Sequence, residues 1–170
     1  MDRQSSMFDL RWKAYGVSAL VFVLDRLTKW IVDTHVSFVD SYRVIPGFFD
    51  IVRSQNSGVA FGIFNDSTSE WRTTLLVIAS VAAVAVVSVM LWRSRNLDRL
   101  TLFGLSLILG GAAGNVFDRI VWGKVTDFLL LYVRDYQWPA FNMADSAIVI
   151  GSGLLMLDMF RSKRQAANVS

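Results

Sequence analysis

The chain contains no cysteine and a single histidine among its 170 residues. Without cysteine it can form no disulfide, has no thiolate nucleophile and cannot itself be lipidated on cysteine. His35 closely follows an apolar stretch, and we interpret it as a surface residue rather than a general base. A zinc protease is disfavoured too, because the oxygen ligands that remain suit zinc poorly. We therefore expect neither a metal nor another cofactor.

Charge is also scarce, at 18% of residues, while 54% are hydrophobic and the mean hydropathy is +0.43. A soluble domain of this length normally carries more charge. The apolar residues are concentrated in runs, and residues 73–92 and 100–117 contain no charged side chain. Each run is about as long as a helix that crosses a hydrocarbon core of roughly 30 Å. These two runs predict membrane spans.

Two further apolar runs, 14–32 and 141–160, are interrupted by charges. These are Asp25, Arg26 and Lys29 in the first run, and Asp145 and Asp158 in the second. We predict one integral membrane domain over residues 1–170, all-α, with four spans. The spans lie at about 14–32, 73–92, 100–118 and 141–160. The first span resembles a signal peptide, but charges interrupt it and no small-x-small cleavage site follows, so we expect it to stay uncleaved.

Basic residues flank the predicted spans on one side. They are Arg3, Arg11, Lys13, Arg93, Arg95, Arg99, Arg161, Lys163 and Arg164. Such a bias marks the cytoplasmic face, so both termini are expected inside and the loops at about 33–71 and 119–140 outside. The net charge of +3 and the pI near 9.5 are then explained by attraction to anionic lipid rather than nucleic acid.

The first outer loop has the alternation and turn residues of short strands. Residues 42–45 and 48–52 predict two strands joined at Pro46-Gly47, and residues 59–64 predict a third. We therefore expect a small extracytoplasmic sheet between the first and second helices. Residues 67–70 match a capping box for the second span, and residues 123–138 suggest a short surface helix.

Most polar side chains of the spans gather near the outer interface. Asp127 and Asp145 lie 18 positions apart on either side of a short loop. Charges at a membrane boundary are costly and usually functional, and two close carboxylates can share a proton and activate water. The opposing interpretation is two unrelated interfacial carboxylates.

Other polar residues also have two interpretations. Asp25 and Lys29, an i,i+4 pair, either serve a substrate site or only neutralise each other during insertion. Asp118 and Arg119 fit the anchoring of a helix end, and Asp158 fits a solvated one. The remaining positions with a bland alternative are the Asn56–Gly58 segment, which fits a plain turn, and the Gly110/Gly114 step, which fits helix packing.

Five segments, in order, resemble those of bacterial lipoprotein signal peptidase (signal peptidase II). DRLTK at 25–29 resembles its D-x-x-[ST]-K segment, and NSGVAF at 56–61 resembles N-x-G-x-A-F. GGAAGNVFDR at 110–119 is similar to G-G-x-x-G-N-x-x-D-R. GKVTDF at 123–128 and FNMADS at 141–146 are similar to the two segments that hold the catalytic aspartates.

The resemblance implies a four-helix aspartyl endopeptidase of the bacterial inner membrane, and we expect the protein to be a monomer. Its substrates would be diacylglyceryl-modified prolipoproteins, cut just before the lipidated cysteine, and the cyclic peptide globomycin would inhibit it. Asp127 and Asp145 would be catalytic. The resemblance carries over these supporting residues: Asp25, Lys29, Asn56, Gly58, Asn115, Asp118, Arg119, Asn142 and Ala144.

Two rival functions remain open from the residues alone. A Ser/Lys hydrolase would use Lys29 as base and Ser54 or Ser57 as nucleophile, but Asp25 one turn away favours a charged lysine. A small four-span transporter would relay ions through the intramembrane charges. That function requires polar steps in both membrane halves, whereas the second and third spans are uncharged until their outer ends.

Overall fold

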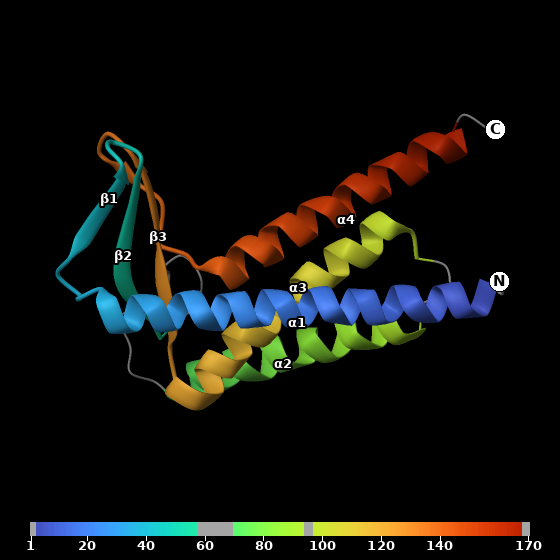
Figure 1. Cartoon of the computed structure of the whole chain (residues 1–170), viewed down its shortest axis with the longest axis horizontal. Helices are drawn as coiled ribbons and strands as arrows, with labels where there is room; N and C mark the ends of the chain where they lie inside the picture. The colour runs from blue at the N-terminus through green and yellow to red at the C-terminus, as the bar shows by residue number, and fades with distance from the viewer. Residues whose placement is uncertain (1–2, 58–69, 94–96, 168–170) are drawn as a thin grey trace.

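The computed structural model describes residues 3–57, 70–93 and 97–167, which form four helices and four strands. Their order is α1 (Arg3–His35), β1 (Ser41–Ile45), β2 (Phe49–Asn56), α2 (Glu70–Arg93), α3 (Arg99–Trp122), β3 (Val125–Val133), β4 (Tyr136–Gln137) and α4 (Met143–Ala167). The sheet lies at one end of the molecule, and the start of α1 and the end of α4 lie at the other (Figure 1).

Small residues on α3 allow its close packing against α1 and α4. A Cβ at Gly110 would lie 2.5 Å from the backbone oxygen of Ser18 on α1, and one at Gly111 would lie 2.4 Å from that of Ala144 on α4. Real side chains do not tolerate such distances. Gly110 therefore serves helix packing within the chain, in agreement with the packing interpretation, and a Cβ at Gly114 would lie 2.5 Å from Asp25 Oδ2 on α1.

Among the described residues, two helical segments are long and apolar enough to cross a bilayer, Arg99–Trp122 and Met143–Arg161. A shorter apolar stretch, Val77–Arg93, lies on α2. The helices extend beyond the predicted spans: α1 includes the polar residues from Arg3 onward, and α4 continues to Ala167. Hydropathy locates the apolar part of a helix, whereas the backbone continues through polar residues that favour the same conformation.

The sheet draws on both predicted outer loops, which corrects the expectation that it lies wholly between the first two helices. Its order is β1-β2-β3-β4, antiparallel throughout. The first two predicted strands are confirmed as β1 and β2. The predicted surface helix within 123–138 is wrong, because these residues form β3 and β4 and pair with β2 and each other. The predicted strand at 59–64, residues 67–69 of the predicted capping box and Gly58 lie outside the described residues, and Glu70 begins α2.

The sheet rests on the end of α1 through a small apolar cluster. Val32 of α1 and Val36, just after the helix, pack against Phe128 of β3, and all three are buried. This contact sets the strand that carries Asp127 beside the helices.

Candidate active site

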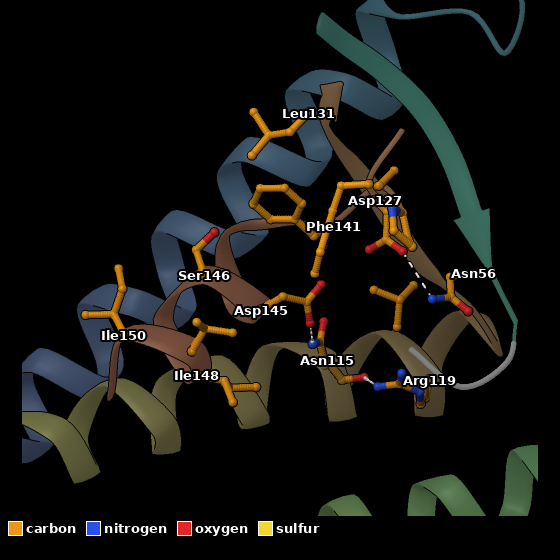
Figure 2. A pocket seen from close by; sticks show the side chains of 15 residues that line it. Asn56, Asn115, Arg119, Asp127, Leu131, Phe141, Asp145, Ser146, Ile148 and Ile150 are labelled. Carbon is orange, nitrogen blue, oxygen red and sulfur yellow. Dashed lines mark hydrogen bonds between the residues drawn. The ribbon is translucent and has the colours of Figure 1, made fainter. Parts of the chain in front are cut away.

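A cavity of about 700 Å³ lies where β3 faces the start of α4 and the end of α3 (Figure 2). Its polar lining consists of Asn56, Asn115, Arg119, Asp127, Asp145 and Ser146. Apolar side chains from β3, the β4–α4 segment and α4 make up most of the rest, including Leu131, Trp138 and Ile148. The structure thus brings the two predicted catalytic aspartates to one cavity.

Asp145 lies in the first turn of α4, held by a reciprocal capping arrangement. Asn142, just before the helix, accepts through its Oδ1 from the Asp145 N–H at 3.0 Å, and its own N–H donates to Asp145 Oδ2 at 3.2 Å. This is the geometry of a capping box, in which each side chain satisfies the other residue's backbone donor. The N-x-x-D pattern before an apolar run, at residues 142–145, is compatible with this arrangement but was not part of the sequence prediction.

Asp127 reaches the cavity from the sheet and is only 4% exposed. Its carboxylate accepts from Asn142 Nδ2 at 2.7 Å and from Asn56 Nδ2 at 3.2 Å. Burial, followed by the negative charge of Asp145, raises the pKa of Asp127 to about 6. A carboxyl group with this pKa can exchange a proton near neutral pH.

One residue contacts both aspartates. Asn142 is fully buried, its amide donates to Asp127, and its backbone N–H donates to Asp145. Asn115, on α3, donates through Nδ2 to Asp145 Oδ1 at 2.7 Å. Both carboxylates therefore accept neutral N–H donors, which hold them in place without adding charge.

A buried ionic cluster of α1 and α3 supports these amides. Lys29 Nζ lies 2.8 Å from Asp25 Oδ2 and 2.6 Å from Asp118 Oδ2, and all three side chains are nearly inaccessible. It also donates to Asn115 Oδ1 at 3.0 Å. Because an ammonium only donates, it directs the Asn115 oxygen toward itself and the Asn115 amide N–H groups toward Asp145.

Asp25 also holds the start of α4 directly. Its Oδ1 accepts from the backbone N–H of buried Ala144 at 3.0 Å, next to Asp145. Gly114 leaves room for it, since a Cβ there would lie 2.5 Å from Asp25 Oδ2. Asp25 and Lys29 therefore do more than neutralise each other, because Asp25 also supports the backbone of α4.

The predicted supporting residues separate into three groups. Asn56, Asn115 and Arg119 line the cavity with the aspartates, and the Arg119 guanidinium donates to the Asn115 backbone oxygen at 3.3 Å. Asn142 forms hydrogen bonds with both aspartates. Asp25, Lys29, Asp118 and Ala144 lie in the supporting cluster. Sequence reasoning gave no site role to Arg26, which pairs with Asp118 and lies 4.8 Å from the Phe117 ring.

Comparison with known proteins decides the family. The family model described as "Signal peptidase (SPase) II" matches residues 17–161. The chain belongs to the signal peptidase II family. The lipoprotein signal peptidase of Solibacter usitatus (strain Ellin6076) is 70% identical over 96% of this chain and 100% of its own length. That of Geobacter metallireducens is 40% identical over 88% of this chain and 91% of its own.

Solved structures agree with this membership. A bacterial membrane enzyme solved by the in meso method at 2.3 Å resolution superposes with a TM-score of 0.78 and 29% identity, covering 89% of each chain. A second, solved at 1.9 Å, gives a TM-score of 0.77 and 26% identity, covering 86% of this chain and 92% of its own. As a member of the signal peptidase II family, the protein is a bacterial membrane protein and a protease.

Proposed function

We propose that the protein is an intramembrane aspartyl endopeptidase that removes signal peptides from diacylglyceryl-modified prolipoproteins. The observation that carries the proposal is that Asp127 and Asp145, from a strand and a helix, line one cavity and are bridged by Asn142. The names of the relatives, lipoprotein signal peptidases, support the substrate class.

The proposed reaction uses one proton shared between the two carboxylates. Two close negative charges in a buried site repel, so the second proton is retained when the first is lost. The ionised aspartate takes a proton from a water molecule as that water attacks the scissile carbonyl carbon. The protonated aspartate hydrogen-bonds the carbonyl oxygen and then helps to protonate the leaving amine. Because the two carboxyl groups titrate as a coupled pair, the role of base is assigned to the pair and not to one of the two aspartates.

The surrounding residues would position substrate and balance charge. Arg119, at the cavity wall, would offset the negative charge that develops in the transition state. Asn56 and Asn115 present amide groups beside the dyad and would grip it or the substrate backbone. The mainly apolar remainder of the lining suits a hydrophobic signal peptide that approaches sideways from lipid.

We propose that all four helices span the bacterial inner membrane, with both termini in the cytoplasm and the sheet outside. The basic flanks support this topology, because they lie in the first part of α1, at the end of α2 and the start of α3, and along the end of α4. Figure 1 places the sheet at the opposite end of the molecule from the start of α1 and the end of α4. The site then lies near the outer headgroups, where the acyl chains of the substrate remain in the bilayer. We expect a monomer.

Cleavage of a purified precursor tests this function. The protein in detergent micelles should cut a diacylglyceryl-modified prolipoprotein just before the modified cysteine, as read by product masses. It should leave the unlipidated precursor intact, and globomycin should inhibit it. Equal cleavage of both precursors would refute the lipid requirement, and no cleavage of either would refute the proposed reaction.

Inhibitor classes separate this mechanism from its enzymatic rival. Lys29 Nζ is held by Asp25, Asp118 and Asn115 rather than directed at a nucleophile. Replacement of Ser54 or Ser57 by alanine should therefore preserve cleavage, and a serine-directed reagent should not inhibit.

A further inference from the structure

The proposed dyad is divided between two parts of the fold. Asp127 belongs to the sheet, on β3, whereas Asp145 belongs to the first turn of α4. Their separation therefore depends on how the sheet is fixed to the helices. Since a misplacement of about 1 Å in an active site can cost roughly 100-fold in rate, contacts that hold β3 against the helices matter for catalysis.

Strand geometry gives β3 a cavity face and an α1 face around Asp127. Successive side chains of a strand point to opposite faces. Asp127 points into the cavity, and its neighbours Thr126 and Phe128 point toward α1. Thr126 Oγ1 donates to Asp33 at the end of α1, 3.1 Å from Oδ1 and 3.3 Å from Oδ2. Asp33 is thus tied to the residue next to Asp127.

The same carboxylate also holds the neighbouring strand. Arg53 of β2 places its Nε 3.1 Å from Asp33 Oδ1. The Arg53 guanidinium lies 4.3 Å from the Phe38 ring centroid and donates to the Val36 backbone oxygen at 3.4 Å. Five contacts, two from Thr126 and three from Arg53, thereby join the end of α1 and the segment that follows it to two strands.

Arg53 occupies a special position in β2. The pairing of β2 with β3 shifts register between Ile51 and Ser54, so Arg53 lies in an irregularity of the β-bulge type. Beyond the shift, Ser54 pairs with Asp127 and Asn56 pairs with Val125. This register brings the Asn56 amide to Asp127. A bulge re-aims the residues beside it, and here the bulge residue is anchored to Asp33.

We propose that Asp33 is a positioning residue for the reaction. By holding Thr126 and Arg53, it fixes the β2–β3 pair against α1. This keeps Asp127 in the same cavity as Asp145 and keeps the Asn56 amide within hydrogen-bond distance of Asp127. Asp33 is absent from the cavity lining, so it acts through these two residues. The inference rests on the proposed dyad, because it assigns Asp33 the task of aligning Asp127.

Steady-state cleavage of a diacylglyceryl-modified precursor tests the proposal. Asp33→Ala and Thr126→Val should each lower kcat by about 10-fold or more, with KM within about twofold, because the alignment of the reacting groups changes while the apolar cavity wall remains. The variant that carries both substitutions should show a decrease in kcat no larger than about that of the more affected single variant, as expected for residues that act through one contact. The decrease in kcat should be smaller for Asp33→Asn than for Asp33→Ala, because the asparagine amide oxygen still accepts a hydrogen bond from Thr126.

The controls separate positioning from stability and from failure of the dyad. Asp135→Ala removes an exposed carboxylate in the turn that follows β3 and should keep kcat. Thermal unfolding shows that each variant is folded at the assay temperature. Full kcat in Asp33→Ala or Thr126→Val, or additive losses in the double variant, would overturn the proposal. If Asp127→Asn kept its activity, the dyad itself would fail, whereas an inactive Asp127→Asn beside a fully active Asp33→Ala would refute the positioning role alone.

Discussion

Replacement of Asp127 by asparagine is predicted to make the folded protein more stable near pH 8. Burial, and then the negative charge of Asp145, raise the pKa of Asp127 from an ordinary 3.8 to about 6. The ionised carboxylate is therefore less favourable in the folded protein than in the unfolded chain. Asparagine has nearly the same shape and never ionises, so it removes this penalty.

The size of the effect follows from the two pKa values. Above pH 6 the difference between 3.8 and about 6 corresponds to about 3 kcal/mol. Between these values the folded protein binds more protons than the unfolded chain, so stability falls as pH rises through this window. The carboxylate of Asp127 accepts from both Asn142 and Asn56, whereas the oxygen of an asparagine replaces only one of its two oxygens. The NH₂ group of that asparagine then faces the N–H donor of the other amide, which costs about 1–2 kcal/mol. A net gain of about 1–2 kcal/mol remains at pH 8, and it is lost before the pH falls to 4.

Thermal unfolding in one detergent, from pH 4 to pH 8, measures this effect. The Tm difference between Asp127→Asn and the unsubstituted protein should be positive at pH 8 and shrink to zero or below at pH 4. Asp135→Asn, which removes an exposed carboxylate in the turn after β3, should give a difference that changes little with pH. A difference for Asp127→Asn that is constant with pH, or that grows toward pH 4, would contradict the argument.

Three further outcomes are expected. The Asn56 hydrogen bond lowers the pKa of Asp127, so Asn56→Leu should raise that pKa and move the alkaline limb of kcat/KM to higher pH; a shift to lower pH would oppose the dyad model. Gly114→Ala should destabilise the fold by about 1–3 kcal/mol, because its Cβ would lie 2.5 Å from Asp25 Oδ2, whereas Gly153→Ala has open space and should not. Equal unfolding midpoints for the two glycine variants would contradict this. Chelators should leave the cleavage rate unchanged, and inhibition that added metal reverses would oppose a metal-free reaction.

Local patterns predicted the helical part of the fold and two of the strands. Apolar runs located the helices, and the turn at Pro46-Gly47 located β1 and β2. The strand β3 was not predicted, because it pairs with β2 although the whole of α2 and α3 lies between them in the sequence. Such pairing depends on distant residues, and the apolar stretch 128–131 has no strict alternation to reveal it.

The site was predictable where its residues lie in short motifs, and less so where the tertiary fold creates the contact. The segments around Asp127 and Asp145 drew attention to both residues. The bond from Asp25 to the Ala144 backbone joins positions 119 apart, and no local pattern marks it. Asp33 and Arg53 belonged to no motif, and their link to Thr126 appears only once the sheet is docked on α1.

The two-aspartate mechanism is tested by the rate at which Asp127→Asn and Asp145→Asn cleave a purified diacylglyceryl-modified precursor. Both variants keep the shape of the site but cannot hold the shared proton. The rate should fall by about 100-fold or more in each. The circular dichroism spectrum and the size-exclusion elution volume of each variant in detergent should match those of the unsubstituted protein. Near-normal cleavage by either folded variant would contradict the two-aspartate mechanism.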